Sequence, residues 1–124
     1  MGKIHTKAAP DAIGPFSQGF VDNNRIYVSG QGPVDPTTGA VVSDDISEQT
    51  ARTLENIAIV LEAAGSSLDN VVKATVFVTD MDDYRAINEV YAEYMTKPYP
   101  ARSAVEVSRL PIEIGVEIEV IATI

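Results

Sequence analysis

One guanidinium and two carboxylates near the end of the chain are the residues best suited to chemistry. Arg102 precedes Glu117 and Glu119, which lie in a run whose even positions from Ile112 to Ile124 are all apolar. An arginine presents five N–H donors and can hold a small carboxylate through two parallel hydrogen bonds. A glutamate within hydrogen-bond reach can hold and deprotonate a water molecule. These residue types predict an anchor and a base acting on a small carboxylate.

The strands expected around these residues would bring them together. Alternating apolar and polar residues predict strands over 100–107 and about 112–124. Leu110-Pro111 suits a turn between them, because proline cannot donate to a strand ladder. In such a hairpin Arg102 would lie near Glu117 or Glu119 on the neighbouring strand. The alternative is a solvated cross-strand ion pair, which residue type alone favours.

Two strands and a helix are predicted in the first half of the chain. Strands over 16–21 and 25–29 are joined by Asp-Asn-Asn, which is good turn chemistry. The glycines of Ser29-Gly30-Gln31-Gly32-Pro33 would let the backbone approach a ligand, although a plain turn fits equally well. A helix is expected from about Asp45 to Ala64, with a capping box at its start and a glycine after its end.

A strand and a second helix are predicted in the second half, before the final strands. The strand covers 70–79, and the helix runs from Asp80 to about Lys97, where Pro98 follows. Its tyrosines follow helical spacing, which predicts core packing. Its acidic first turn favours interaction with the helix dipole over calcium binding, because the spacing of a calcium loop is missing.

This order of elements predicts a single α+β domain over residues 1–124. A mixed sheet of about six strands would carry both helices on one face. The other face would present Val71, Phe77 and Ile121, apolar residues that no helix is left to cover. Self-association is the expected cover for that face.

Composition excludes several classes of site. The 124 residues contain no cysteine and one histidine, His5, so thiol chemistry is excluded and a histidine metal site is disfavoured. The formal net charge is −9, without a cluster of basic residues, which argues against binding to nucleic acid or anionic membranes. No apolar run is long enough to span a membrane. A cytoplasmic protein without metal or cofactor is therefore expected.

Several segments resemble the Rid family, also called the YjgF/YER057c/UK114 family, and within it the RidA branch. The similarity covers nearly the whole chain and is carried by Ile13-Gly14-Pro15-Phe16-Ser17-Gln18-Gly19, Val28-Ser29-Gly30-Gln31, Gln49, Ala51, Leu54, Asn56, Glu62-Ala63-Ala64-Gly65, Val72-Lys73-Ala74-Thr75-Val76-Phe77-Val78, Pro100-Ala101-Arg102-Ser103, Val105, Leu110 and Val116-Glu117-Ile118. The resemblance implies a chorismate-mutase-like fold. It also implies a homotrimer around a central barrel, with ligand clefts between subunits.

The same resemblance implies a reaction and residues for it. The reaction is hydrolysis of 2-imino or enamine acids, such as 2-aminoacrylate and 2-iminobutanoate, to 2-oxo acids and ammonia. PLP-dependent dehydratases release these substrates, and the hydrolysis itself needs no cofactor. Arg102 matches the arginine that binds the substrate carboxylate, and Glu117 matches the glutamate that orients water. Ser29 and Gly30 match the loop that lines the cleft, and Asn88 matches an asparagine near the pocket.

Two expected pocket residues depart from the RidA pattern. Phe16 stands where many members have tyrosine, and Ala104 stands where cysteine is common. Activity is expected to survive because Arg102 and Glu117 are intact, while the substrate preference stays open. The alternative function is a trimer that binds small carboxylates, such as 2-oxo acids, without turnover. A ribonuclease or translation-inhibitor role is disfavoured by the acidic balance and the absence of paired histidines.

Overall fold

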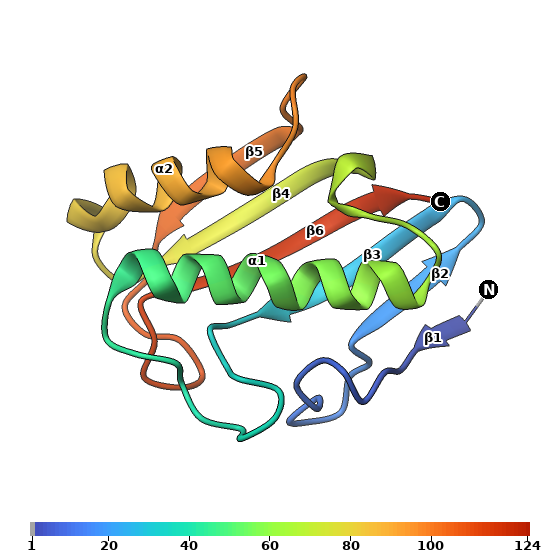
Figure 1. The fold of residues 1–124 in the computed structure, drawn as a ribbon, viewed down its shortest axis with the longest axis horizontal. Helices are drawn as coiled ribbons and strands as arrows, with labels where there is room; N and C mark the ends of the chain where they lie inside the picture. Colours follow the sequence, from blue (N-terminus) through green and yellow to red (C-terminus); the bar gives the residue numbers. More distant parts are fainter. Residues whose placement is uncertain (1) are drawn as a thin grey trace.

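A computed structural model describes residues 2–124 as one mixed sheet with both helices on the same face (Figure 1). The elements are β1 (Gly2–Ile4), β2 (Gly19–Asp22), β3 (Arg25–Gln31), α1 (Ile46–Ala63), β4 (Val71–Val78), α2 (Tyr84–Tyr94), β5 (Ala101–Glu106) and β6 (Val116–Thr123), with short 3-10 turns at Leu68–Asn70 and Met81–Asp83. The predicted α+β class is confirmed, as are the six-stranded sheet and the two helices on one face. Within the described residues, no helix is long and apolar enough to cross a membrane.

The order of the strands overturns the predicted hairpin of the last two. The sheet runs β1-β2-β3-β6-β4-β5, so β4 lies between β5 and β6. β5 pairs with β4 in parallel, whereas β6 pairs with β4 and β3 in antiparallel fashion. The physical reason is that β4, α2 and β5 form a crossover unit, which delivers β5 to the outer edge of β4. β6 then returns to the open position between β3 and β4.

Helix α1 begins and ends where its capping residues predict. The Asp45 side chain accepts a hydrogen bond from the backbone N–H of Glu48 at 2.9 Å. After the helix, Gly65 has a φ of +80°, a left-handed conformation that favours glycine. Leu54, Ile57 and Leu61 are fully buried between the helix and the sheet.

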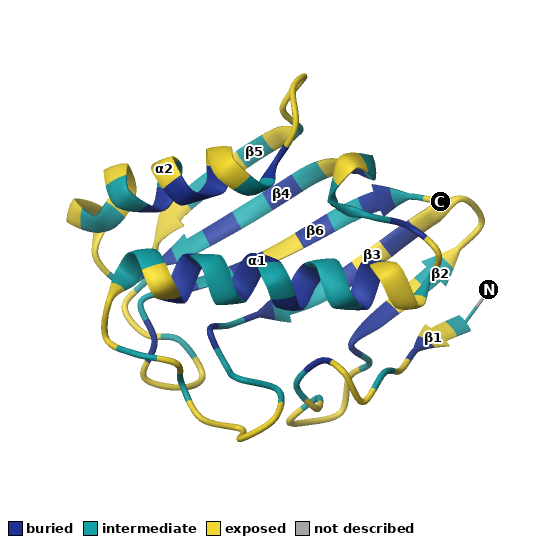
Figure 2. Ribbon diagram, in the orientation of Figure 1, coloured by how far each residue is buried: buried dark blue, intermediate teal, exposed yellow. Residues whose placement is uncertain are grey.

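The face of the sheet without helices carries apolar and polar side chains, and one residue predicted for it is missing from it. Buried and less buried residues alternate along β4 and β6 (Figure 2). Phe77 and Ile121 lie on this uncovered face as predicted, but Val71 is 7% exposed and belongs to the core. The register between β4 and β6 shifts between Val71 and Lys73, which turns Val71 inward. Phe77 and Ile121 are partly exposed, whereas Phe20, Tyr27 and Val105 on the same face are exposed.

Three buried amide side chains hold the loops at one end of the sheet. Gln18, Gln49 and Asn56 are each 5% exposed or less. Their amide nitrogens donate to backbone carbonyls, namely those of Thr6 and Pro10 for Gln18, of Ser43 for Gln49, and of Gly32 and Val34 for Asn56. The Oε1 atom of Gln49 also accepts from the Gly115 N–H at 2.8 Å. These bonds satisfy loop carbonyls that lie away from water and so fix the loops.

Candidate functional site

Arg102 is held against helix α2 by polar and aromatic side chains. Its Nη2 donates to the Asn88 Oδ1 at 2.8 Å and to the Tyr84 hydroxyl oxygen at 2.9 Å. The centre of the guanidinium lies 4.8 Å from the centroid of the Tyr91 ring and 5.5 Å from that of Tyr84. Within residues 2–124 no carboxylate forms an ion pair with Arg102. The guanidinium is therefore fixed in place while its charge stays uncompensated.

The three residues that hold Arg102 share one face of α2. Tyr84, Asn88 and Tyr91 are spaced by four and three positions, so their side chains stack along the helix surface. The structure thus brings Asn88 together with Arg102. The assignment of Tyr84 to the core is wrong, since this side chain is 38% exposed, whereas Tyr91 is 5% exposed. The sequence signal for this grouping is the helical spacing of Tyr84, Asn88 and Tyr91, which places a polar residue between two tyrosines on one face of the helix.

Glu117 lies on the uncovered face of the sheet, close against β3. Its neighbours Val116 and Ile118 are fully buried beneath the helices, so the intervening side chain points to the other face. A Cβ atom on Gly30 would lie only 2.8 Å from the Glu117 Cδ. The glycine thereby leaves room for the carboxylate. Burial, with a smaller contribution from the Glu119 charge, raises the pKa of Glu117.

Glu117 opens into an apolar cavity of about 400 Å³. Phe16 and Gly30, two of the predicted site residues, line this cavity together with the apolar side chains of Ile13, Val34, Pro111, Ile112 and Ile114. The Phe16 side chain is exposed and projects from the loop before β2. A cavity of this size and lining suits a small molecule with a short apolar side chain.

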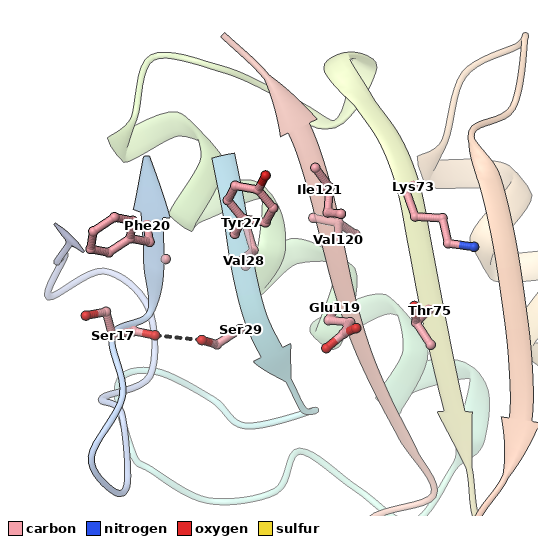
Figure 3. A pocket seen from close by; sticks show the side chains of 11 residues that line it. Ser17, Phe20, Tyr27, Val28, Ser29, Lys73, Thr75, Glu119, Val120 and Ile121 are labelled. Atoms are coloured by element: carbon pink, nitrogen blue, oxygen red, sulfur yellow. Dashed lines mark hydrogen bonds between the residues drawn. The ribbon is translucent and has the colours of Figure 1, made fainter. Parts of the chain in front are cut away.

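Ser29 and Ala104 lie apart from this cavity. The Ser29 hydroxyl donates to the Ser17 carbonyl at 2.7 Å, as the dashed line in Figure 3 shows. It lines a second pocket on the uncovered face, where Glu119 lies beside Thr75. Ala104 follows Arg102 by two residues and packs against the core. The predicted site residues therefore divide between an Arg102 half, with Asn88 and Ala104, and a Glu117 half, with Phe16 and Gly30.

The predicted proximity of Arg102 and Glu117 within the chain is wrong. In the sheet register Arg102 pairs with Ala74 and Glu117 pairs with Phe77, on opposite edges of β4. Two strand spacings and three residues along β4 place their Cα atoms roughly 14 Å apart. Their side chains also point to opposite faces of the sheet. A small acid bound to Arg102 cannot reach Glu117 of the same chain.

Comparisons with known proteins agree over nearly the full chain. A family model described as Endoribonuclease L-PSP matches residues 6–124. A RutC family protein of Pyrococcus horikoshii is 53% identical over 119 residues, which cover 96% of this chain and 94% of that protein. A Salmonella typhimurium protein named 2-iminobutanoate/2-iminopropanoate deaminase is 47% identical over 122 residues, covering 96% and 94%.

Solved structures carry the same fold. The crystal structure of Escherichia coli TdcF with bound serine superposes with a TM-score of 0.94 at 42% identity, covering 100% of this chain and 99% of that one. RidA from an Antarctic Psychrobacter gives a TM-score of 0.96 at 42% identity and full coverage of both chains. With such identities along the whole chain and a matching family model, this protein belongs to the Rid family.

Proposed function

We propose that this protein hydrolyses 2-imino acids to 2-oxo acids and ammonia. The observation that carries the proposal is the pair of half-sites, a fixed guanidinium without a counter-ion and a partly buried carboxylate with a raised pKa. The first suits the carboxylate of the substrate, and the second suits a base for water. The relative at 47% identity that is named as an imine deaminase supports the same reaction.

The active site is proposed to form between two copies of the chain. Since Arg102 and Glu117 of one chain cannot serve one small substrate, Arg102 of one copy would face Glu117 of the next. Phe20, Tyr27 and Val105 are exposed apolar residues of the uncovered face, and association of two copies through this face would bury them. A homotrimer, as the family resemblance implies, would supply three equivalent sites.

The proposed chemistry conserves every atom of imine and water. Glu117 removes a proton from a water molecule while the water oxygen bonds to C2 of the protonated imine. The resulting carbinolamine takes the proton from Glu117 onto its nitrogen, the C–N bond breaks, and ammonia leaves. Loss of the hydroxyl proton completes the 2-oxo acid. A raised pKa makes the Glu117 carboxylate a stronger base for the first step.

The lining of the Glu117 cavity favours short aliphatic substrates. Phe16 offers no hydroxyl and Ala104 offers no thiol, so neither can transfer a proton. Glu117 is then the proton carrier among the predicted site residues. Most of the cavity walls are apolar, with Asp11, Gln18 and Gln31 as polar exceptions, which predicts a preference for the imines of alanine- and aminobutyrate-sized acids.

The name of the matching family model points to ribonuclease activity, which the chain's composition disfavours. The net charge of −9 repels a phosphate backbone, and His5 is the single histidine. His5 is exposed in the loop after β1 and lines neither the Glu117 cavity nor the pocket beside Arg102. The acid–base pair of histidines that RNA cleavage could use is therefore missing.

The test is the rate of 2-oxobutanoate formation from threonine by a purified threonine dehydratase, a PLP enzyme, with and without this protein. Wild type should accelerate imine decay, whereas Arg102→Ala and Glu117→Gln should lose about 10²–10³-fold in kcat/KM. Glu113→Gln, at an exposed loop position, is the matched control. No acceleration by wild type, with 2-oxobutanoate still bound, would favour the carboxylate-binding alternative.

A further inference from the structure

The hydrogen bonds of Arg102 leave its guanidinium unable to grip a carboxylate alone. Both N–H groups of Nη2 are used, one by the Asn88 Oδ1 and one by the Tyr84 hydroxyl oxygen. A guanidinium offers a carboxylate two pairs of parallel donors, Nη1 with Nη2 and Nε with Nη2. Each pair includes an N–H of Nη2. In this arrangement every pair therefore has one donor already occupied.

The Tyr84 hydroxyl is placed to supply the missing donor. Its oxygen accepts from Arg102 at 2.9 Å, which leaves its own O–H free to donate. Within residues 2–124 the Tyr84 hydroxyl donates no hydrogen bond, and the residue is 38% exposed. A hydroxyl that accepts a hydrogen bond from a cation is polarised and becomes a stronger donor.

We propose that Tyr84 is a second binding residue for the substrate carboxylate, an inference that rests on the proposed function. One carboxylate oxygen accepts from a free N–H of Arg102, and the other accepts from the Tyr84 O–H. Asn88 keeps its bond to Nη2, and the Tyr91 ring supports the guanidinium from its flat side at 4.8 Å. The anchor is thus an arginine–tyrosine pair presented by β5 and α2.

Binding of 2-oxobutanoate, the product of the proposed reaction, tests this inference without turnover. Tyr84→Phe keeps the ring and removes the hydroxyl, so the dissociation constant measured by calorimetry should rise about tenfold, the usual effect of losing one hydrogen bond to a charged group. Tyr94→Phe is the matched control, because it removes a hydroxyl of the same helix that bonds to Glu55 at 2.8 Å. That control should stay within about twofold of wild type.

A second ligand and a kinetic readout separate binding from structural damage. 2-Butanone keeps the ketone but lacks both carboxylate oxygens, so Tyr84→Phe should leave its weak binding unchanged. In the deamination assay Tyr84→Phe should raise KM and change kcat by less than about twofold, as expected for binding lost equally from ground and transition states.

Unchanged or tighter binding of 2-oxobutanoate by Tyr84→Phe would overturn the inference, tighter binding meaning that the hydroxyl competes with the ligand for Nη2. Absence of 2-oxobutanoate binding to wild type would overturn it as well. A failure of the proposed function alone would give another result. Wild type would then bind 2-oxobutanoate in a Tyr84-dependent way but would leave the rate of imine decay unchanged.

Discussion

The two half-sites are built by different means. Arg102 stands on the edge strand β5, none of whose residues is buried, and is held by side chains from one helix. Glu117 stands on an inner strand between two buried neighbours, against a glycine. The loops around its cavity are held by the buried amides Gln18 and Asn56.

Substitutions in the two halves should therefore have different effects on the stability of the protein. A substitution near Arg102 removes a few partly exposed hydrogen bonds, each worth about 1 kcal/mol, and should leave the fold intact. A substitution near Glu117 changes the main chain or a buried amide, so the carboxylate moves or the protein loses stability. The surroundings of Arg102 thus tolerate substitution, whereas Glu117 is held by the main chain and the buried side chains around it.

The largest effect is expected when Arg102 and Glu117 are supplied by different chains. Arg102→Ala and Glu117→Gln are each expected to be inactive. If each site takes its cation from one copy and its base from another, unfolding and refolding the two variants together restores intact sites. In an equal mixture with random assembly, about a quarter of the sites hold both residues. The measurement is the rate of imine decay before and after mixing.

The control for the mixing experiment is refolding each variant alone, which should restore nothing. A mixture that stays inactive, although mass spectrometry shows mixed assemblies, would contradict a site shared between chains. The two halves would then need another way to meet.

The next largest effect is expected from Gly30→Ala in the Glu117 half. The added Cβ would lie 2.8 Å from the Glu117 Cδ and 3.1 Å from its Cγ, so the glutamate side chain must move. Because this side chain is flexible, the melting temperature should change little, while kcat falls about 10²-fold. Gly65→Ala places a methyl group in open space but at a φ of +80°, away from the cavity, so it should lower stability without lowering kcat.

The sequence predicted the strand and sheet face of Glu117 correctly, but it predicted the strand neighbours of Arg102 wrongly. Period-two alternation identified β6 and the face of Glu117, and the capping residues located α1. The neighbours of Arg102 were predicted wrongly because alternation fixes which face a residue occupies but not which strand lies beside it. Strand order depends on the crossover through α2, a long-range property that no local pattern records.

Smaller features escaped prediction for related reasons. The register shift that buries Val71 follows from the pairing of β4 with β6, not from the residues of β4 alone. Tyr84 and Tyr91 have the same residue type and helical spacing, yet one supports Arg102 from the surface and the other from the core. Family resemblance predicted Arg102, Asn88 and Glu117 as site residues, but it did not predict that Arg102 and Glu117 lie on separate faces of one chain.

Replacing an asparagine by alanine in each half should lower stability by different amounts. Asn56→Ala removes the donors to the Gly32 and Val34 carbonyls, at 3.1 and 2.8 Å, and should lower the free energy of unfolding by about 2–3 kcal/mol. Asn88→Ala removes a partly exposed bond to Arg102 and should cost less than about 1 kcal/mol. Urea denaturation at one fixed protein concentration gives both values. Equal losses in the free energy of unfolding would mean that the hydrogen bonds around Arg102 stabilise the fold as much as those of Asn56.

The smallest expected effect is a shift in pH dependence that acts through Glu117. Burial is the main cause of its raised pKa and the Glu119 charge is the lesser one, so the acid limb of kcat/KM should lie above the ordinary range of glutamate. Glu119→Gln should move this limb to lower pH without reaching that range, whereas Glu113→Gln should leave it in place. A limb unaffected by Glu119→Gln would assign the raised pKa to burial alone.

Stability provides an independent reading of the same carboxyl group. Because the folded pKa of Glu117 is raised, the folded state binds more protons than the unfolded state between the two pKa values. Stability should therefore fall as pH rises through that window, and the full cost of burying the charge remains above it. Glu117→Gln removes this cost, so its free energy of unfolding relative to wild type should increase from below the window to neutral pH. If the difference in the free energy of unfolding between Glu117→Gln and wild type stays constant with pH, Glu117 has the same pKa in the folded and unfolded states. Burial in the folded protein would then impose no cost on the charged carboxylate.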